Sequence, residues 1–161
     1  MKQHYYKRVF ANKVTYKGIE FNSKMEADFA MFLDGVAFRY KNMGFYHKPV
    51  KWEYETKQFT LIEQENWVDK TEKDNSVKRI RRNKKHTLQQ VIYTPDFYLP
   101  DYDLLIEIKG VQFDDGLFAM RLRLFRHKYP EKALAIIRHH EEFYKLDEIL
   151  ENIKINEDES K

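Results

Sequence analysis

Residues 94–110, with the sequence TPDFYLPDYDLLIEIKG, combine the pattern of two apolar β-strands with charged residues inside those strands. A two-residue turn at Asp101 and Tyr102 would place Asp96 directly opposite Glu107, and directly opposed residues point to the same face of a sheet. Because side chains alternate along a strand, Lys109 lies on the same face as Glu107. The sequence therefore predicts two carboxylates and one ammonium group together at one end of a hairpin.

Two facing carboxylates repel each other, and the repulsion grows when water is excluded. A divalent cation between them makes the pair favourable, and a site with few carboxylates and several positions for water and phosphate is typical of Mg²⁺. Lys109 would offset the charge and could reach a bound water or a phosphate. The simpler interpretation is a surface salt bridge between Lys109 and either carboxylate. The flanking apolar residues favour a buried hairpin over a solvated one.

The stretch SKMEADFAMFLDGVAF, which begins at Ser23, has the period of an amphipathic helix. Its apolar face is predicted to contain Met25, Phe29, Phe32, Leu33 and Val36. Glu26 lies at the margin of this face, where it could serve a functional site. Ser23 and Glu26 also form a capping-box pattern, in which the Glu side chain reaches back to the N-cap amide. The sequence leaves both roles of Glu26 open.

The residues P-D at 95–96 and E-I-K at 107–109 resemble the signature of the PD-(D/E)XK, or restriction-endonuclease-like, nuclease superfamily. Glu26 matches the acidic residue that this family has on a preceding helix. The resemblance covers about residues 21–138. The stretch YTPDFYLPDYDLLIEIKG is most similar to phage enzymes of the endonuclease I type, which resolve Holliday junctions during DNA recombination. The resemblance implies an α/β fold with a mixed sheet flanked by helices.

The resemblance also implies a site and an activity. Asp96 and Glu107 would bind Mg²⁺, with Mn²⁺ able to substitute, and the Ile108 backbone carbonyl would assist them. Glu26 would complete the catalytic and metal-binding set, and Lys109 would assist the attacking water. The expected activity is hydrolysis of DNA phosphodiester bonds by an endonuclease, selective for branched DNA.

Basic residues are concentrated in the first part of the chain. The formal net charge is +3, but residues 141–161 contain eight acidic residues and three lysines, which leaves +8 on residues 1–140. A basic body indicates a polyanionic partner, although many basic proteins do not bind nucleic acid. The candidates for DNA contact are Lys78, Arg79, Arg81, Arg82, Lys84, Lys85, Arg121 and Arg123. A solvated loop and an ordinary exposed helix face are the alternative explanations.

The order of periodic segments predicts one domain over residues 1–161, and the resemblance implies that it is a nuclease domain. Two hairpin strands followed by a helix and another strand imply a mixed sheet with helices on its faces. Residues 66–90 are predicted to form an exposed basic loop or hairpin arm, and residues 141–161 an acidic helix and tail. In the helix after the hairpin, Leu117, Met120, Leu124 and His127 or Lys128 recur at helical spacing, which is the pattern of one helix face. In the last helix, the predicted inward residues are Phe143, Leu146, Ile149, Leu150 and Ile153.

The chain contains no cysteine, which favours a reducing compartment, and it has no apolar run near the ~18 residues that cross a membrane. Its first residues, MKQHYYKRVF, lack the apolar core of a secretory signal. We therefore expect a cytoplasmic protein, in the host cytoplasm if it is phage-encoded. The leading hypothesis is a homodimeric, Mg²⁺-dependent junction-resolving endonuclease. The alternatives are a nicking or restriction-like endonuclease without junction preference and a non-catalytic DNA-binding module with a nuclease-like fold.

Overall fold

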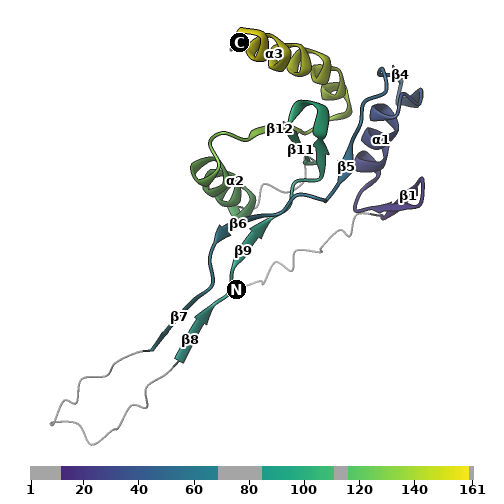
Figure 1. Ribbon diagram of the computed structural model, residues 1–161. Helices are drawn as coiled ribbons and strands as arrows, with labels where there is room; N and C mark the ends of the chain where they lie inside the picture. The colour runs from purple at the N-terminus through teal and green to yellow at the C-terminus, as the bar shows by residue number, and fades with distance from the viewer. Residues whose placement is uncertain (1–11, 69–84, 111–115, 160–161) are drawn as a thin grey trace, which may run out of the picture.

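The structure, a computed structural model, describes residues 12–68, 85–110 and 116–159. Only the backbone is described at 67–68, 85–86 and 154–159. The fold is mixed α/β, with three α-helices and several small sheets in these segments (Figure 1). Among the described residues, no helix has the length and apolarity needed to cross a membrane.

The central sheet has four strands in the order β12-β11-β10-β5. Strand β10 (Phe97–Leu99) pairs antiparallel with β5 (Glu53–Tyr54) and with β11 (Leu104–Ile108), whereas β11 pairs parallel with β12 (Ala133–Ile137). The connection from β11 to β12 contains helix α2 (Gly116–Lys128), as a parallel pair requires a crossover. The predicted mixed sheet is therefore confirmed.

The register of the β10–β11 hairpin is the predicted one, with Phe97 opposite Ile106 and Leu99 opposite Leu104. Its turn differs from the predicted two-residue turn. Residues Pro100–Tyr102 form a short 3₁₀ helix, η1, and Asp103 follows with φ 42° and ψ 39°. Proline suits the first position of such a turn, and aspartate tolerates the left-handed conformation. The longer turn leaves the pairing unchanged because it inserts no residue into either strand.

Both faces of the hairpin are covered, which explains why all five residues of β11 are buried. The even-numbered residues Leu104, Ile106 and Ile108 belong to a large apolar cluster with helices α1 (Lys24–Leu33) and α3 (Lys145–Glu159). Leu105 belongs to a smaller cluster on the other face, where Phe125 of α2 packs. A strand covered on both faces shows a continuous apolar run instead of alternation.

Helix α1 buries the predicted face. Phe29, Phe32 and Leu33 are fully buried, whereas Val36 lies beyond the helix end and is 37% exposed. Gly35 ends the helix with φ 71°, and a Cβ at this position would lie 2.6 Å from Pro49 Cγ. Glycine is required here both by the backbone conformation and by the close approach of the next segment.

Helix α2 does not bury Leu117 and Met120, two residues of its helix-face pattern. Leu117 and Met120 are 56% and 48% exposed, and the buried residues are Phe118 and Phe125. Leu124 is partly buried at the edge of the small cluster. The two phenyl rings, which are seven residues apart and carry more apolar surface, take the inner face instead.

The described residues also form four two-stranded sheets. They pair β1 (Val14–Tyr16) with β2 (Ile19–Phe21), β3 (Phe38–Tyr40) with β4 (Met43–Phe45), β6 (Phe59–Ile62) with β9 (Val91–Tyr93), and β7 (Glu65–Val68) with β8 (Lys85–Leu88). The β3–β4 hairpin was not predicted. The β7–β8 pair continues from β6 and β9 and projects away from the helices (Figure 1). Most of the predicted loop or arm, over residues 66–90, lies outside the described residues.

The chain ends in a short 3₁₀ helix, η2 (His140–Tyr144), followed by α3. Phe143, Leu146 and Leu150 are buried, and Ile149 and Ile153 pack against the large cluster. The predicted inward face of this closing helix is therefore confirmed.

Candidate active site

Asp96 and Glu107 lie at the same end of the β10–β11 hairpin. Asp96 immediately precedes β10, and Glu107 is the fourth residue of β11. The observed pairing of Phe97 with Ile106, continued by one residue, places Asp96 against Glu107. Glu107 is 8% exposed and Asp96 is half-buried. The hairpin thus holds two carboxyl groups close together and largely away from water.

Each of these carboxylates is held by one of its two oxygens. The Ile108 backbone N–H donates to Asp96 Oδ2 over 2.6 Å. The Tyr93 hydroxyl donates to Glu107 Oε2 over 3.0 Å. Within the described part of the chain, no hydrogen bond is made to Asp96 Oδ1 or to Glu107 Oε1. Among the described residues, one oxygen of each carboxylate is therefore without a hydrogen-bond donor.

Burial raises the pKa of Asp96 well above its usual range, and the negative charges of Glu107 and Glu26 raise it further. Burial also raises the pKa of Glu107 to about 7, although the hydrogen bond from Tyr93 and two nearby positive charges oppose the rise. Buried like charges favour the protonated state, and they favour a bound cation for the same reason. A divalent cation bound by both carboxylates would therefore relieve their electrostatic repulsion.

Glu26 is fully engaged by the start of helix α1. The Ser23 hydroxyl donates to Glu26 Oε1 over 2.7 Å, and Glu26 Oε2 accepts from the Tyr54 hydroxyl at 2.5 Å and from the Asn22 amide at 3.2 Å. Ser23 is the N-cap, as the capping box predicts, but Glu26 reaches the amide of Asn22 and not that of Ser23. Glu26 would have to give up one of these donors to bind a metal directly.

Two positive side chains lie within electrostatic range of the carboxylate pair. Lys109 and Arg121 both lower the pKa of Glu107. The Lys109 backbone N–H donates to the Ile137 carbonyl at 2.8 Å, and Lys109 Nζ lies 4.4 Å from the centre of the Phe118 ring. These contacts fix Lys109 between the central sheet and helix α2. Arg121 lies exposed on the same helix.

The Ile108 carbonyl is expected to point toward the same side of β11 as the Ile108 N–H, which is the side of Asp96. The N–H and C=O of one strand residue point to the same side, and the Ile108 N–H points to Asp96. In the continued register Pro95 lies opposite Ile108, and proline has no N–H to donate to that carbonyl. The sequence P-D therefore frees the Ile108 carbonyl from the ladder at the point where Asp96 contributes its carboxylate.

Of the remaining predicted DNA contacts, the structure describes Arg123 and the backbone of Lys85. Arg123 is exposed on α2. Lys85 begins β8, where only the backbone is described. Five residues of the basic run lie outside the described residues, namely Lys78, Arg79, Arg81, Arg82 and Lys84.

Sequence reasoning did not find the partners of the acidic residues. Tyr93 and Tyr54 come from strands whose pairing the sequence does not define, and their alternation indicates only that they face inward on a strand. Glu55 was also missed: its N–H donates to the Asp96 carbonyl at 2.8 Å, and its charge raises the pKa of Asp96. Asn22 Nδ2 holds the Glu55 side chain at 2.9 Å.

Among the described residues, no three His, Cys, Asp or Glu side chains are grouped as a metal cluster. The donor set nevertheless suits a hard cation that keeps several waters, because the Asp96 and Glu107 carboxylates lie close enough for the charge of Glu107 to raise the pKa of Asp96. Mg²⁺ is commonly bound by one or two carboxylates together with water and substrate phosphate. Such a cation would take its remaining ligands from water and from a phosphate. Glu26 is not a ready third ligand, because both of its carboxylate oxygens already accept hydrogen bonds.

Two histidines, His139 and His140, follow β12. His140 is buried, and its Nε2 lies 2.9 Å from Asp28 Oδ2. The His140 ring stacks on Tyr40 with 3.6 Å between ring centres. These contacts are those of a buried structural residue.

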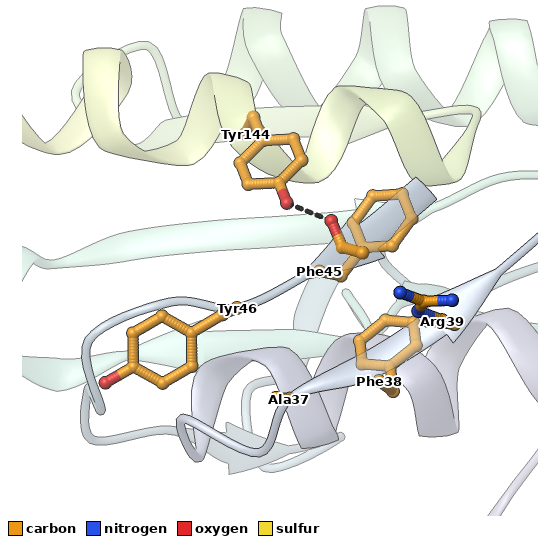
Figure 2. A pocket seen from close by; sticks show the side chains of 7 residues that line it. Ala37, Phe38, Arg39, Phe45, Tyr46 and Tyr144 are labelled. Carbon is orange, nitrogen blue, oxygen red and sulfur yellow. Dashed lines mark hydrogen bonds between the residues drawn. The ribbon is translucent and has the colours of Figure 1, made fainter. Parts of the chain in front are cut away.

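A separate pocket of about 520 Å³ lies beside the β3–β4 hairpin. Figure 2 shows side chains that line it, among them Phe38, Phe45 and Tyr46, and the hydrogen bond that the Tyr144 hydroxyl donates to the Gly44 carbonyl. None of the predicted site residues lines this pocket.

The fold and the site together define a mixed α/β protein with a carboxylate pair, one member buried and the other half-buried, at the end of a central hairpin. Comparisons with protein-family models, with curated proteins and with solved structures found no match for the chain. Its function must therefore be inferred from the residues of this site and from the sequence signature that they form.

Proposed function

We propose that the chain is a Mg²⁺-dependent endonuclease that hydrolyses DNA phosphodiester bonds. The observation that carries the proposal is the pair Asp96 and Glu107, two mutually repelling carboxylates held in a largely buried place on adjacent strands. Purely structural carboxylates in such a place would be costly, whereas metal ligands there are favourable. The resemblance to the PD-(D/E)XK signature supports the same interpretation of the pair.

Asp96 Oδ1, Glu107 Oε1 and the Ile108 carbonyl would hold the cation, since the other carboxylate oxygens are taken by Ile108 and Tyr93. Mg²⁺, or Mn²⁺ in its place, polarises a phosphate and lowers the pKa of a bound water when present. Glu26 contributes negative charge at the edge of the site and becomes a ligand only if it releases the Tyr54 hydroxyl or another donor.

Positive side chains of the chain itself bind and orient the substrate. Lys109 is positioned by the Ile137 carbonyl and the Phe118 ring, so its ammonium can orient the attacking water and stabilise charge that develops on the phosphate. Arg121 approaches the same carboxylates from α2 and would contact an adjacent phosphate. The two apolar clusters around the hairpin keep bulk water from the pair.

Selectivity for four-way junctions is the finer part of the proposal. It is supported by the resemblance to phage junction-resolving enzymes, by the net charge of +8 on residues 1–140, and by the projecting β7–β8 arm. Resolution of a junction needs two incisions, so this part of the proposal also requires a homodimer. An endonuclease without junction preference would use the same pair and the same metal.

The first prediction tests the site. Asp96→Asn and Glu107→Gln keep the shape of each side chain but remove ligand charge, so cleavage of plasmid DNA in Mg²⁺ should fall by at least about 100-fold. The measurement is nicking and linearisation of supercoiled plasmid over time, with all proteins purified identically. Asp101→Asn, an exposed carboxyl in the turn of the same hairpin, is the matched control and should cleave normally.

If the Asp96→Asn protein cleaves DNA normally, Asp96 is not a ligand of the metal. DNA binding without cleavage by the unaltered chain in Mg²⁺ and Mn²⁺ would favour the non-catalytic DNA-binding module instead.

A further inference from the structure

Two acidic residues near the site, Glu107 and Glu26, each accept a hydrogen bond from a buried or half-buried tyrosine. The Tyr93 hydroxyl donates to Glu107 Oε2 at 3.0 Å, and the Tyr54 hydroxyl donates to Glu26 Oε2 at 2.5 Å. We infer that Tyr93 is a positioning residue, which fixes the Glu107 carboxylate so that Oε1 is presented to a divalent cation beside Asp96. This inference rests on the proposed function of the Asp96–Glu107 pair.

Tyr93 is itself held firmly in place. It is 4% exposed, it lies in β9 opposite Phe59, and its ring centre is 5.2 Å from that of Phe125. Phenylalanine at this position would fill the same space and keep the same ring contacts. The hydroxyl is therefore not needed for packing, and its one hydrogen bond among the described residues is to the Glu107 carboxylate.

The bond from Tyr93 complements the bond on Asp96. The Ile108 N–H fixes Asp96 through Oδ2, and Tyr93 fixes Glu107 through Oε2, so each carboxylate offers one oxygen in a set direction. A ligand that is already ordered loses less side-chain entropy when a metal binds. Outer partners of this kind typically change metal affinity or activity by about 10- to 100-fold when they are removed.

Tyr54 is the instructive comparison. Its removal would leave Glu26 with donors from Ser23 and from the Asn22 amide, so Glu26 would keep its place. Removal of the Tyr93 hydroxyl leaves Glu107 without that fixed donor on the β9 side. The structure therefore assigns the larger effect on metal binding to Tyr93.

The test measures Mn²⁺ binding to the full chain, without DNA, by isothermal titration calorimetry. Tyr93→Phe should weaken Mn²⁺ binding by about 10-fold, and Tyr54→Phe should weaken it by less than about threefold. Tyr98→Phe is the matched control, because its hydroxyl donates to Asp103 Oδ1 at 3.1 Å at the far end of the same hairpin. This control should bind Mn²⁺ as the unaltered chain does.

A second readout separates positioning from a general structural role. In Tyr93→Phe, the Mg²⁺ concentration for half-maximal cleavage should rise by the same factor as the Mn²⁺ dissociation constant, while DNA affinity in EDTA stays unchanged. Unchanged Mn²⁺ affinity in Tyr93→Phe, with or without a lower melting temperature, would overturn the inference and leave the proposed function intact. If Mn²⁺ binding by the unaltered chain survives Asp96→Asn and Glu107→Gln, the proposed metal site itself is wrong.

Discussion

Glu107 and Asp96 give the metal-free protein a folding stability that depends on pH. Because burial raises their pKa values, both residues bind protons more tightly in the folded than in the unfolded chain. A raised carboxyl pKa means that the free energy of unfolding falls as pH rises from the unfolded value towards the folded value. For Glu107 this window runs from the ordinary value of 4.5 to about 7.

The second prediction follows from this sign. Glu107→Gln has no proton to lose at this position, so its free energy of unfolding relative to the unaltered chain should increase across this window. The gain should approach the order of 3 kcal/mol above pH 7, where one pKa unit corresponds to about 1.4 kcal/mol. Urea unfolding in EDTA at several pH values measures it. A difference that stays constant from pH 4.5 to 8 would show that Glu107 ionises normally in the folded chain.

Helix α1, which carries Glu26, is fastened to the C-terminal part of the chain by a buried polar contact. Asp28 is 6% exposed and accepts from His140 at 2.9 Å and from Lys24 at 2.7 Å. Burial opposes ionisation of Asp28, but these two partners outweigh it and hold its pKa below the usual range. Asp28 therefore stays charged and joins α1 to η2.

The third prediction concerns this contact. Asp28→Ala should lower the free energy of unfolding by about 3 kcal/mol, because it leaves a buried His140 without its partner. The measurement is urea unfolding at pH 7, with Asp101→Asn as the exposed control. Mn²⁺ affinity at a temperature where the variant is folded should change little, since Asp28 is absent from the groups that shift the pKa of Asp96 and Glu107. An Asp28→Ala chain as stable as the control would mean that Asp28 does not anchor the helix.

At the level of elements, the periodicity of apolar residues predicted the features that depend on nearby residues, namely the hairpin register and the buried face of α1. Alternation and a turn between two apolar runs were enough for the register of the hairpin, and with it the approach of Asp96 to Glu107. The face of α1 followed from helical spacing. The face of α2 did not, because Leu117, Met120 and Leu124 share a helical stripe as plausible as that of Phe118 and Phe125, and only the shape of the core selects between them.

The parts of the site that sequence could not predict depend on pairing between distant strands. Tyr93 reaches Glu107 from β9, a strand of another sheet, and Tyr54 reaches Glu26 from β5, across 28 residues of chain. The sequence predicted only part of the hydrogen bonding of Glu26, because it indicated the Ser23 cap but not the hydrogen bond from Tyr54. Neither the composition nor the hydrophobic periodicity of the sequence predicts the pairing register of β5 with β10 or the position of β9.

Over the whole molecule, charge is divided between a basic body and an acidic end. The fourth prediction concerns the basic run in the arm, whose residues lie outside the described part of the chain. Neutralising Lys78, Arg79, Arg81 and Arg82 together should reduce the slope of log K against log[salt] for duplex DNA by up to about 3.6, at about 0.9 for each phosphate that the protein no longer neutralises. The metal requirement should not change. An unchanged slope, measured by fluorescence anisotropy from about 50 to about 300 mM salt, would mean that the run is only a solvated loop.

The fifth prediction concerns the substrate as a whole. A four-way junction presents phosphates in several arms, so a basic body with a projecting hairpin can contact more of them than a linear duplex offers. A two-fold dimer would double those contacts and place two Asp96–Glu107 pairs on opposing strands.

In Ca²⁺, which supports binding but poor chemistry at such sites, the chain should bind a four-way junction at least about 10-fold more tightly than a duplex of equal length, as one extra group of phosphate contacts would give. Addition of Mg²⁺ should then produce paired, symmetric nicks near the branch point, read on a sequencing gel. The bound complex should have the mass of a dimer. Equal affinity for the two substrates, or a monomer on the junction, would contradict junction resolution and leave a simpler endonuclease with the same carboxylate pair.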